Sequence, residues 1–536
     1  MSEKKRSLEN SHHNSNFALW WYALILAALV WSYSSGGQWS TSVVVLLLAL
    51  SFSIESVLRK VFPDPLPVMM ISSKKYEQYV EDAKRQMRES LGSKITLSQK
   101  GNVSTIFSQA LPTKKTSKLD LNKFVGIIDF DEKNATVTVG GKTPFKMLTE
   151  FLIPRGLCPQ VVPELDTITV GGAISGVGIE SSSFRHGFVH NSMIEIHVLM
   201  GDGRVIKASE QENQDLFRGF AHSYATLGYI LSAKLRLMKC TRDVRIVAKR
   251  MSLRETMKCI QEEVKGDRAD FIEGIVFDKN DALVLTATFT KTSFSASNRV
   301  ELPRDGRFKD ILESRTQKNN STSFVMSTYD YLWRWDADMF WGTDDLPGLG
   351  SSTLRTILGR RVLRATVLWW LGQKVRRISS FFSHLFKKTI ERERVIQDLG
   401  LPFPNAVHFI EQVIENNHAQ LPFWLCPARF EGIHEAATLW PPPRGQPKSG
   451  GWMLDIASFG SVPRHKSSED KYYHNRALDK LLDQLGGGKT FYSDVLYTRD
   501  FIHEHFNGDE YEKLKRKYDP HSRFPMLCDK VINKDA

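Results

Sequence analysis

Residues 163–187 have the sequence PELDTITVGGAISGVGIESSSFRHG, and this stretch decides the fold. Residues 167–170 predict a short β-strand that leads into a glycine-rich turn. Glycines at this density allow the backbone to adopt positive φ and to approach a ligand closely. The stretch therefore predicts a cofactor turn, with an ordinary structural loop as the alternative. The glycines of the turn are Gly171, Gly172, Gly176 and Gly178.

The residues after the turn suit a ligand that contains phosphate. Consecutive backbone N–H groups in such turns bind phosphate oxygens, and the hydroxyl groups of Ser181, Ser182 and Ser183 add hydrogen-bond donors. Glu180 is expected to accept a hydrogen bond from a ribose or from the edge of a ring. The spacing differs from the GxGxxG and GxxxxGK[ST] fingerprints, so neither of the common nucleotide-binding turns is predicted.

The sequence on both sides of the turn predicts a mixed domain of helices and antiparallel strands. Strand pairs joined by short polar turns are typical of hairpins, and the second hairpin turns at Gly201-Asp202-Gly203. The predicted elements are a helix at 76–91, strands at 123–131 and 135–140, a helix at 145–154, strands at 192–200 and 205–208, and a buried run at 225–237 that contains Gly228.

The composition of the 536-residue chain is that of a folded globular protein, with 41% hydrophobic and 25% charged residues. At roughly 150 residues per domain, this length predicts several domains. A mean hydropathy of −0.29 excludes a polytopic transporter. A net charge of +12 favours an anionic partner or surface. The five cysteines are scattered without a CxxC pair, which is typical of reduced thiols rather than a disulfide framework.

The first 60 residues predict a membrane anchor. No charged residue lies between Glu9 and Glu55, and this segment contains apolar runs at 17–31 and 43–50. A membrane-spanning helix needs about 20 residues, so a hairpin of two short spans and one span followed by an interfacial helix both fit. A signal peptide is the remaining alternative. Basic residues on both flanks predict that both ends, and the protein body, face the cytosol.

The motifs from residue 163 onward resemble a known family. The glycine turn, the SSS run, the strand–DG–strand hairpin, NQDLF at 213–217 and TLGY at 226–229 resemble the flavin domain of the vanillyl-alcohol-oxidase/PCMH superfamily. The segments PELDTITVGG and GIESSSFRHG are most similar to the Δ24-sterol reductases. This family comprises the 24-dehydrocholesterol reductases and the plant Diminuto type. The similarity covers nearly the whole chain after about residue 66, because it resumes at 424–430, 454–460 and 491–518.

This resemblance implies an α+β fold: a two-lobed PCMH/VAO-type FAD-binding domain at 61–240, after an anchor at 1–60, and an α+β substrate or cap domain at 241–536. The early loop that carries a flavin-linked His in many superfamily members corresponds to residues 98–107, which contain no His, so non-covalent FAD is implied. The implied cofactor-binding residues are Gly171, Gly172, Ala173, Ile174, Ser175, Gly176, Val177, Gly178, Ile179, Glu180, Ser181, Ser182, Ser183, Phe184, Arg185, Gly187 and, in a second approach loop, Gly228.

Two stretches of the second half are unusual in composition. Residues 329–341 hold six aromatics in thirteen residues, which line either a pocket for a flat apolar ligand or a core. Residues 354–390 hold nine Lys or Arg and no acidic residue. A basic amphipathic helix with Trp and Phe favours a membrane surface, and a solvated helix packed on the body is the alternative. No nucleic-acid motif accompanies this charge, so nucleic-acid binding is not expected.

The chemistry implied by the resemblance is reduction of an isolated sterol side-chain alkene by NADPH, with FAD as the hydride relay. Such an alkene needs a proton from an acid in a dry pocket. Tyr492 and Tyr497 are the expected donors, with Asp494 as an orienting group, and the alternative is that both tyrosines only shape the substrate wall. The sequence 503–505, His-Glu-His, lacks the HExxH spacing, so no metal site is expected.

The expected protein is therefore a flavoenzyme of sterol biosynthesis, anchored in the endoplasmic reticulum membrane with its catalytic body in the cytosol. The nearest alternative is a plant-type enzyme that isomerises and reduces a 24(28) alkene. A non-catalytic sterol-binding membrane protein of the same fold is the alternative from another class. The sequence does not determine the oligomeric state.

Overall fold

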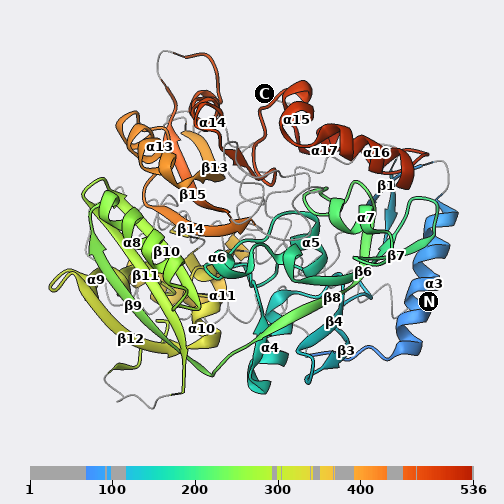
Figure 1. The fold of residues 1–536 in the computed structure, drawn as a ribbon, viewed down its shortest axis with the longest axis horizontal. Helices are drawn as coiled ribbons and strands as arrows, with labels where there is room; N and C mark the ends of the chain where they lie inside the picture. Colours follow the sequence, from blue (N-terminus) through green and yellow to red (C-terminus); the bar gives the residue numbers. More distant parts are fainter. Residues whose placement is uncertain are drawn as a thin grey trace, which may run out of the picture.

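The computed structural model describes residues 68–90, 93–97, 116–291, 298–303, 305–338, 340–341, 351–365, 367–368, 392–430, 451–465 and 468–533. Two antiparallel sheets form two lobes that lie side by side, and short helices fill the space between them (Figure 1). The C-terminal helices lie above the first lobe in this view. The predicted anchor at 1–60 and the loop at 98–107 lie outside the described residues.

The first lobe is built on a six-stranded antiparallel sheet in the order β3-β4-β8-β6-β7, with β5 paired to β8. The first half of the long central strand β8 is buried, which fits its apolar residues, and its C-terminal half is partly exposed. A separate parallel pair, β1 (Lys94–Leu97) and β2 (Thr116–Leu119), lies beside it. The strands of the main sheet are β3 (Ile127–Asp131), β4 (Thr136–Gly140), β5 (Leu157–Pro159), β6 (Met193–Leu199), β7 (Val205–Ser209) and β8 (Tyr229–Lys239).

The helices of the first lobe are short except for the first. Ser72 caps that helix by accepting a hydrogen bond from the Lys75 N–H at 3.4 Å, and its buried residues are Ala83 and Met87. The helices are α3 (Ser73–Glu89), α4 (Phe145–Leu152), η1 (Ile153–Arg155), α5 (Val170–Ser175), α6 (Ser183–His186), η2 (Val189–Ser192) and α7 (Gln214–Gly219).

The second lobe is an eight-stranded antiparallel sheet in the order β12-β9-β11-β10-β14-β15-β13-β16. Side chains alternate between its faces: Ile272 and Leu425 pack toward α8 and α13, whereas Phe271 and Trp424 belong to the core shared with the first lobe. The strands are β9 (Asp243–Met251), β10 (Phe271–Asp278), β11 (Asp281–Thr290), β12 (Ser321–Ser327), β13 (Arg392–Pro402), β14 (Phe423–Phe430), β15 (Gly451–Pro463) and β16 (Gly488–Lys489).

One face of this sheet is covered by three amphipathic helices, and shorter helices pack on the other face near β9 and β12. The Ser252 and Glu255 side chains form a capping box at the start of α8. The helices are α8 (Leu253–Gly266), α13 (Phe403–Glu415) and α14 (Tyr473–Gln484) on the first face, and α9 (Phe308–Thr316), α10 (Thr328–Leu332), η4 (Asp336–Asp338) and α11 (Ser352–Val362) elsewhere.

The end of the chain returns to the first lobe through α15 (Arg499–His505), α16 (Gly508–Tyr518) and α17 (Leu527–Val531) (Figure 1). The Tyr518 hydroxyl donates to Asp215 at 2.7 Å, and Arg523 donates to the Ser90 carbonyl at 2.9 Å. The division of the chain at residue 240 therefore does not follow the packing of this segment.

The periodicities of the sequence place most elements within two or three residues of their observed bounds, and the hairpin at Gly201-Asp202-Gly203 is confirmed. The strand predicted at 167–170 is wrong. Thr169 forms only an isolated bridge to Pro144, and its side chain caps α5, which begins at Val170. The capping hydroxyl and the following small residues fold this stretch into a helical turn.

The described part of the basic segment 354–390 packs on the body. Arg355 is fully buried and donates to the Asp305 carbonyl at 2.9 Å, and Leu363 and Ala365 are buried. Gly359 breaks the helix with a φ of 72°. Residues 369–390 lie outside the described ranges. Among the described residues, no helix is long and apolar enough to cross a membrane.

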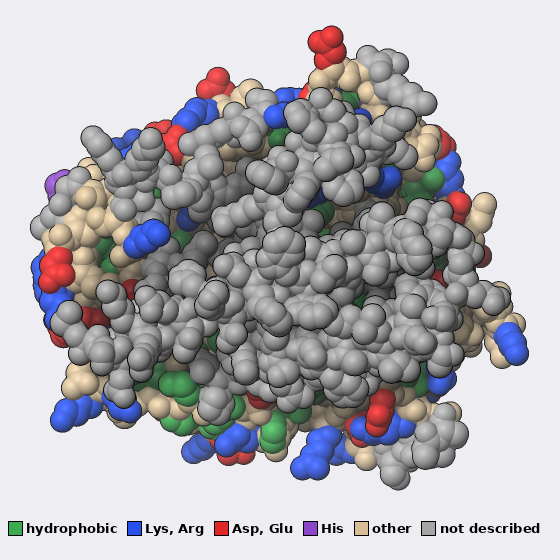
Figure 2. Space-filling view, turned by 180° about the vertical axis from the view of Figure 1, so that it is seen from behind, with side chains coloured by type: hydrophobic (Ala, Val, Ile, Leu, Met, Phe, Trp, Pro, Cys, Tyr) green, Lys and Arg blue, Asp and Glu red, His purple; other side chains and the backbone are tan. Residues whose placement is uncertain are grey.

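Figure 2 shows the face of the molecule opposite to that of Figure 1. Lys and Arg side chains alternate with acidic ones around its rim.

Candidate functional site

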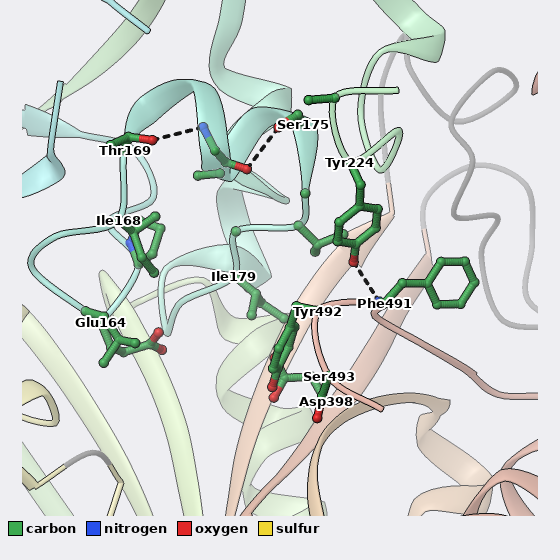
Figure 3. Close-up of a pocket in the computed structure, with 18 of the residues that line it drawn as sticks. Glu164, Ile168, Thr169, Ser175, Ile179, Tyr224, Asp398, Phe491, Tyr492 and Ser493 are labelled. Atoms are coloured by element: carbon green, nitrogen blue, oxygen red, sulfur yellow. Dashed lines mark hydrogen bonds between the residues drawn. The ribbon is translucent and has the colours of Figure 1, made fainter. Parts of the chain in front are cut away.

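A cavity of about 360 Å³ lies where the two lobes meet, at the glycine-rich turn. Residues from the first lobe line one wall, and residues from β13, β15 and the segment after β16 line the facing wall (Figure 3). The lining residues are Pro163, Glu164, Leu165, Ile168, Thr169, Gly172, Ala173, Ser175, Gly176, Val177, Gly178, Ile179, Tyr224, Ala225, Phe340, Asp398, Phe459, Phe491, Tyr492, Ser493, Lys530 and Val531.

The first wall is the glycine turn and helix α5. Thr169 Oγ1 accepts a hydrogen bond from the Gly172 N–H at 3.2 Å, and the Ser175 hydroxyl donates to the Gly172 carbonyl at 3.3 Å (Figure 3). Gly171 packs against the backbone of Gly141, where a Cβ would lie 2.8 Å from the carbonyl oxygen. The turn is thus fixed by its own backbone contacts, and small residues are required for them.

After α5 the chain runs extended along the cavity from Val177 to Ile179. Within the described part of the chain, the backbone N–H groups of Val177, Gly178 and Ile179 form no hydrogen bond, although all three residues line the cavity. A Cβ on Gly178 would lie 2.5 Å from Val189 Cγ2. Three adjacent donors at a mostly apolar cavity fit a planar ligand with acceptor atoms on its edge.

A strained loop holds the turn from the side. His222, Tyr224 and Ala225 have backbone φ values of 59°, 49° and 57°, which residues other than glycine rarely adopt. The Tyr224 N–H donates to the Ser175 carbonyl at 2.8 Å, and the Tyr224 hydroxyl accepts from the Phe491 N–H at 2.6 Å. This loop therefore ties the glycine turn to the segment that carries Tyr492. Strain of this kind concentrates at functional sites.

The facing wall carries an acidic group. Asp398 on β13 lies beside Tyr492 and Ser493, and the side chains of Asp398 and Tyr492 interact (Figure 3). Burial raises the pKa of Asp398 to about 7, although the Tyr492 hydroxyl opposes this shift. Burial and the neighbouring Asp398 raise the pKa of Tyr492 well above its ordinary value. The wall thus holds a carboxyl group that exchanges its proton near neutral pH.

Glu180 has a different role from the one expected. It is buried and accepts from Arg334 at 2.6 Å, and Arg334 also binds Glu273 of β10 at 2.8 Å. The Ser181 hydroxyl donates to Glu180 at 2.6 Å. Although burial raises the pKa of Glu180, Arg334 and the other partners lower it below its ordinary value. Glu180 and Ser181 are thus used to join the lobes, and neither lines the cavity.

The remaining predicted cofactor residues divide into two groups. Gly172, Ala173, Ser175, Gly176, Val177, Gly178 and Ile179 line the cavity, as do Thr169 and Glu164 before them. The others support it from behind: Ser182 donates to the Gln160 carbonyl, Arg185 pairs with Asp267 and Asp270, and the Phe184 carbonyl accepts from Trp452. The residues outside the lining are Gly171, Ile174, Glu180, Ser181, Ser182, Ser183, Phe184, Arg185, Gly187 and Gly228.

The expected proton donors lie in different environments. Tyr492 lines the cavity, whereas Tyr497 stacks on Phe501 at 4.4 Å between ring centroids and is not part of the lining. Asp494 pairs with Arg394 at 2.8 Å, and the carboxyl group that interacts with Tyr492 is Asp398. His503 is half exposed, and within the described ranges no group of three or more His, Cys, Asp or Glu is placed to hold a metal ion.

The aromatic segment 329–341 contributes mainly to the core. Tyr331, Trp335 and Trp341 are at most 1% exposed and belong to the central core. Of the described residues in this segment, Phe340 lines the cavity, where it stacks on Phe459 with ring centroids 4.5 Å apart. The core interpretation therefore holds for most of these side chains, and the pocket interpretation holds for one.

Sequence reasoning missed Asp398, Tyr224 and Lys530, which come from three distant parts of the chain. A signal exists for Asp398, because it is an acidic residue within the buried strand β13. Nothing in the local sequence brings Lys530 to the cavity, where it donates to the Tyr224 carbonyl. The walls together fit a flavin: a planar apolar space, free N–H donors on one side and an acid on the other.

Comparison with known proteins supports this fit. A family described as FAD binding domain matches residues 78–209, so the chain contains an FAD-binding domain with mixed α and β structure. The chain is 26% identical over 470 residues to the Delta(24)-sterol reductase of Homo sapiens, covering 85% of this chain and 86% of the relative. The Delta(24)-sterol reductase of Arabidopsis thaliana is 22% identical over 428 residues, 75% of this chain and 74% of the relative. The resemblance to the sterol reductases is thereby confirmed.

A second kind of relative is similar over a shorter stretch. Cytokinin dehydrogenase 5 of Arabidopsis thaliana is 28% identical over 251 residues, which is 45% of this chain and 44% of the relative. The similarity to the sterol reductases extends over both lobes.

Proposed function

We propose that this protein is an FAD-dependent oxidoreductase that uses NADPH to reduce the Δ24 side-chain double bond of a sterol. The observation that carries the proposal is the cavity itself. It places the glycine turn of an FAD-binding domain opposite the buried carboxyl group of Asp398, in a chain similar over both lobes to Delta(24)-sterol reductases. Bound flavin would accept a hydride from NADPH and pass it to the alkene.

The chain's own residues are assigned by their positions. The N–H groups of Val177, Gly178 and Ile179 would bind the edge of the flavin, which rests on α5. Phe340 and Phe459 provide a flat apolar surface for a hydrocarbon side chain. Water is excluded by this apolar lining, and the proton needed by the second alkene carbon comes from the facing wall, where Tyr492 and Asp398 lie.

We also propose that the protein is anchored in the endoplasmic reticulum membrane through residues 1–60, with the body in the cytosol. This rests on the uncharged segment between Glu9 and Glu55 and on its basic flanks. The substrate is then a membrane-embedded lipid.

The test is the absorbance spectrum of detergent-solubilised full-length protein, taken anaerobically before and after NADPH and then with a Δ24 sterol such as desmosterol. Oxidised-flavin absorbance that bleaches with NADPH and returns with the sterol is expected. Folded protein without flavin would refute the cofactor assignment. Bleaching without sterol-driven return would refute the substrate.

A glycine variant tests the flavin position. Gly176→Val projects a branched side chain into the cavity, where the nearest atom outside the turn, Tyr224 Cε1, would lie 3.9 Å from the new Cβ. Bound flavin is expected to fall about tenfold or more, because the side chain occupies ligand space. The matched control is Gly266→Val at the exposed end of α8, which should retain flavin. Equal flavin content in the two purified variants would contradict the placement.

A further inference from the structure

Two acidic residues face the cavity side of the second sheet from neighbouring strands. Asp398 lies on β13 and Asp455 on β15, and the register pairs Asp398 with Ala457 and Gly400 with Asp455. Leu399 and Leu454, adjacent to them in sequence, belong to the core under the helices on the other face. The two carboxyl groups are therefore diagonal neighbours on one face, with α-carbons about 7–8 Å apart.

In the described part of the chain, the carboxyl group of Asp455 is buried without partners that would offset the cost of removing it from water. It is 0% exposed, and neither carboxyl oxygen has a hydrogen-bond partner among the described residues. Burial first, and Asp398 second, raise the pKa of Asp455 well above its ordinary value. A carboxylate in such a place would be strongly destabilised, so this position favours the protonated form.

Asp398 connects this buried acid to the cavity. It is 9% exposed, lines the cavity and interacts with Tyr492. The other titratable groups that face it are Asp455 from β15, Tyr224 from the loop before β8, and Glu164 and Lys530 from the cavity lining. Lys530 donates to the Tyr224 carbonyl, and the Glu164 carboxyl interacts with Glu180.

An isolated alkene accepts a proton only from a strong acid, and a neutral carboxyl group is a stronger acid than a phenol by several pKa units. The Tyr492 phenol is made weaker still by its surroundings. The acid of the pair Tyr492–Asp398 that suits this chemistry is therefore the carboxyl group.

We propose that Asp398, which shares its buried sheet face with the unpaired Asp455, is the proton donor of the alkene reduction, and that Tyr492 is a positioning residue. The inference rests on the proposed function. The O–H bond of Asp398 breaks and a C–H bond forms at one alkene carbon, while the hydride that originates from NADPH bonds to the other. Asp398 is left as a carboxylate and regains its proton from water.

The test separates the two half-reactions in rapid-mixing experiments. In Asp398→Asn, bleaching of the flavin by NADPH should stay within about twofold of wild type, whereas its return with sterol should slow by about 100-fold or more. The matched control is Asp129→Asn, an exposed position on β3, which should change neither rate. Equal return rates in Asp398→Asn and wild type would overturn the inference and leave the proposed function intact.

Two further variants fix the assignment. Asp455→Asn replaces one uncharged group by another of similar size, so the rate of the sterol half-reaction and its pH limit should both stay close to those of the wild type. Glu164→Gln removes the other acid of the lining, and a selective 100-fold loss in that variant instead of Asp398→Asn would overturn the proposal. If sterol did not reoxidise the reduced wild-type protein, both the proposed function and this inference would be contradicted.

A readout independent of turnover and of variant folding completes the test. Infrared spectra of the wild-type protein without sterol should contain a protonated-carboxyl band that is lost as the pH rises through about 7, the pKa of Asp398. The sterol half-reaction of the wild type should slow over the same range. A rate that is constant from about pH 6 to 9 would contradict the proposal.

Discussion

Two clusters of buried acids lie on the same face of the second sheet. They differ in whether their carboxyl groups have a cationic partner. Glu273 and Glu180 share the guanidinium of Arg334, and Glu273 also accepts from the indole N–H groups of Trp335 and Trp424 at 3.1 and 2.7 Å. Among the described residues, no ion pair with Asp398 or Asp455 is formed, and neither oxygen of Asp455 has a hydrogen-bond partner. The first cluster has a cation, whereas in the second cluster burial raises the pKa of both carboxyl groups.

The difference shows how burial divides structural from chemical roles. The Arg334 guanidinium pairs with both carboxyl groups of the first cluster, and the cluster thereby joins the glycine turn to β10. Incomplete pairing leaves the Asp398 pair with protons that are available near neutral pH. The acid predicted from the sequence to bind a ligand, Glu180, belongs to the structural cluster.

The largest expected effect is on stability. Arg334→Leu removes a guanidinium that is 0% exposed and leaves two buried carboxylates without a cation. Unfolding free energy should fall by about 3–5 kcal/mol, seen as a lower midpoint of thermal unfolding. The control is Arg299→Leu, whose ion pair with Asp243 is partly exposed and worth about 0–1 kcal/mol. Similar midpoints for the two variants would contradict the structural role.

The next effect is a pH dependence of stability. The pKa of Asp398 is about 7 in the folded protein and 3.8 ordinarily, so folding favours the protonated form. Its contribution is complete below about pH 4 and is lost as the pH rises to 7, by at most about 1.4 kcal/mol per pH unit. Asp398→Asn should therefore gain stability relative to wild type between pH 5 and 8, measured by urea unfolding. A difference independent of pH would show that Asp398 is charged throughout.

A smaller effect is expected at Tyr492. Tyr492→Phe keeps the ring but removes the hydroxyl that interacts with Asp398. The sterol half-reaction should slow about tenfold, less than in Asp398→Asn, and its pH limit should move upward because Tyr492 lowers the pKa of Asp398. A loss as large as that of Asp398→Asn, with an unchanged pH limit, would make the phenol the donor.

The smallest effect is expected at Tyr497. Its ring stacks on Phe501 and carries the Lys489 ammonium 4.8 Å from its centroid, away from the cavity lining. Tyr497→Phe retains this packing, so both half-reactions should stay within about twofold of wild type. A selective loss of the sterol half-reaction in this variant would indicate that Tyr497 takes part in the proton transfer.

The sequence by itself determined the glycine turn, the family resemblance and most of the elements, because periodicity and turn residues are local signals. The strand at 167–170 was mistaken because the Thr169 side chain caps a helix there. Only the tertiary structure decided which polar residues are free for chemistry. Glu180, Asp398 and Asp455 are all buried acids, and their surroundings differ because Arg334, distant in sequence, reaches only the first. Electrostatic pairing depends on contacts across the two lobes, and residue order alone does not specify them.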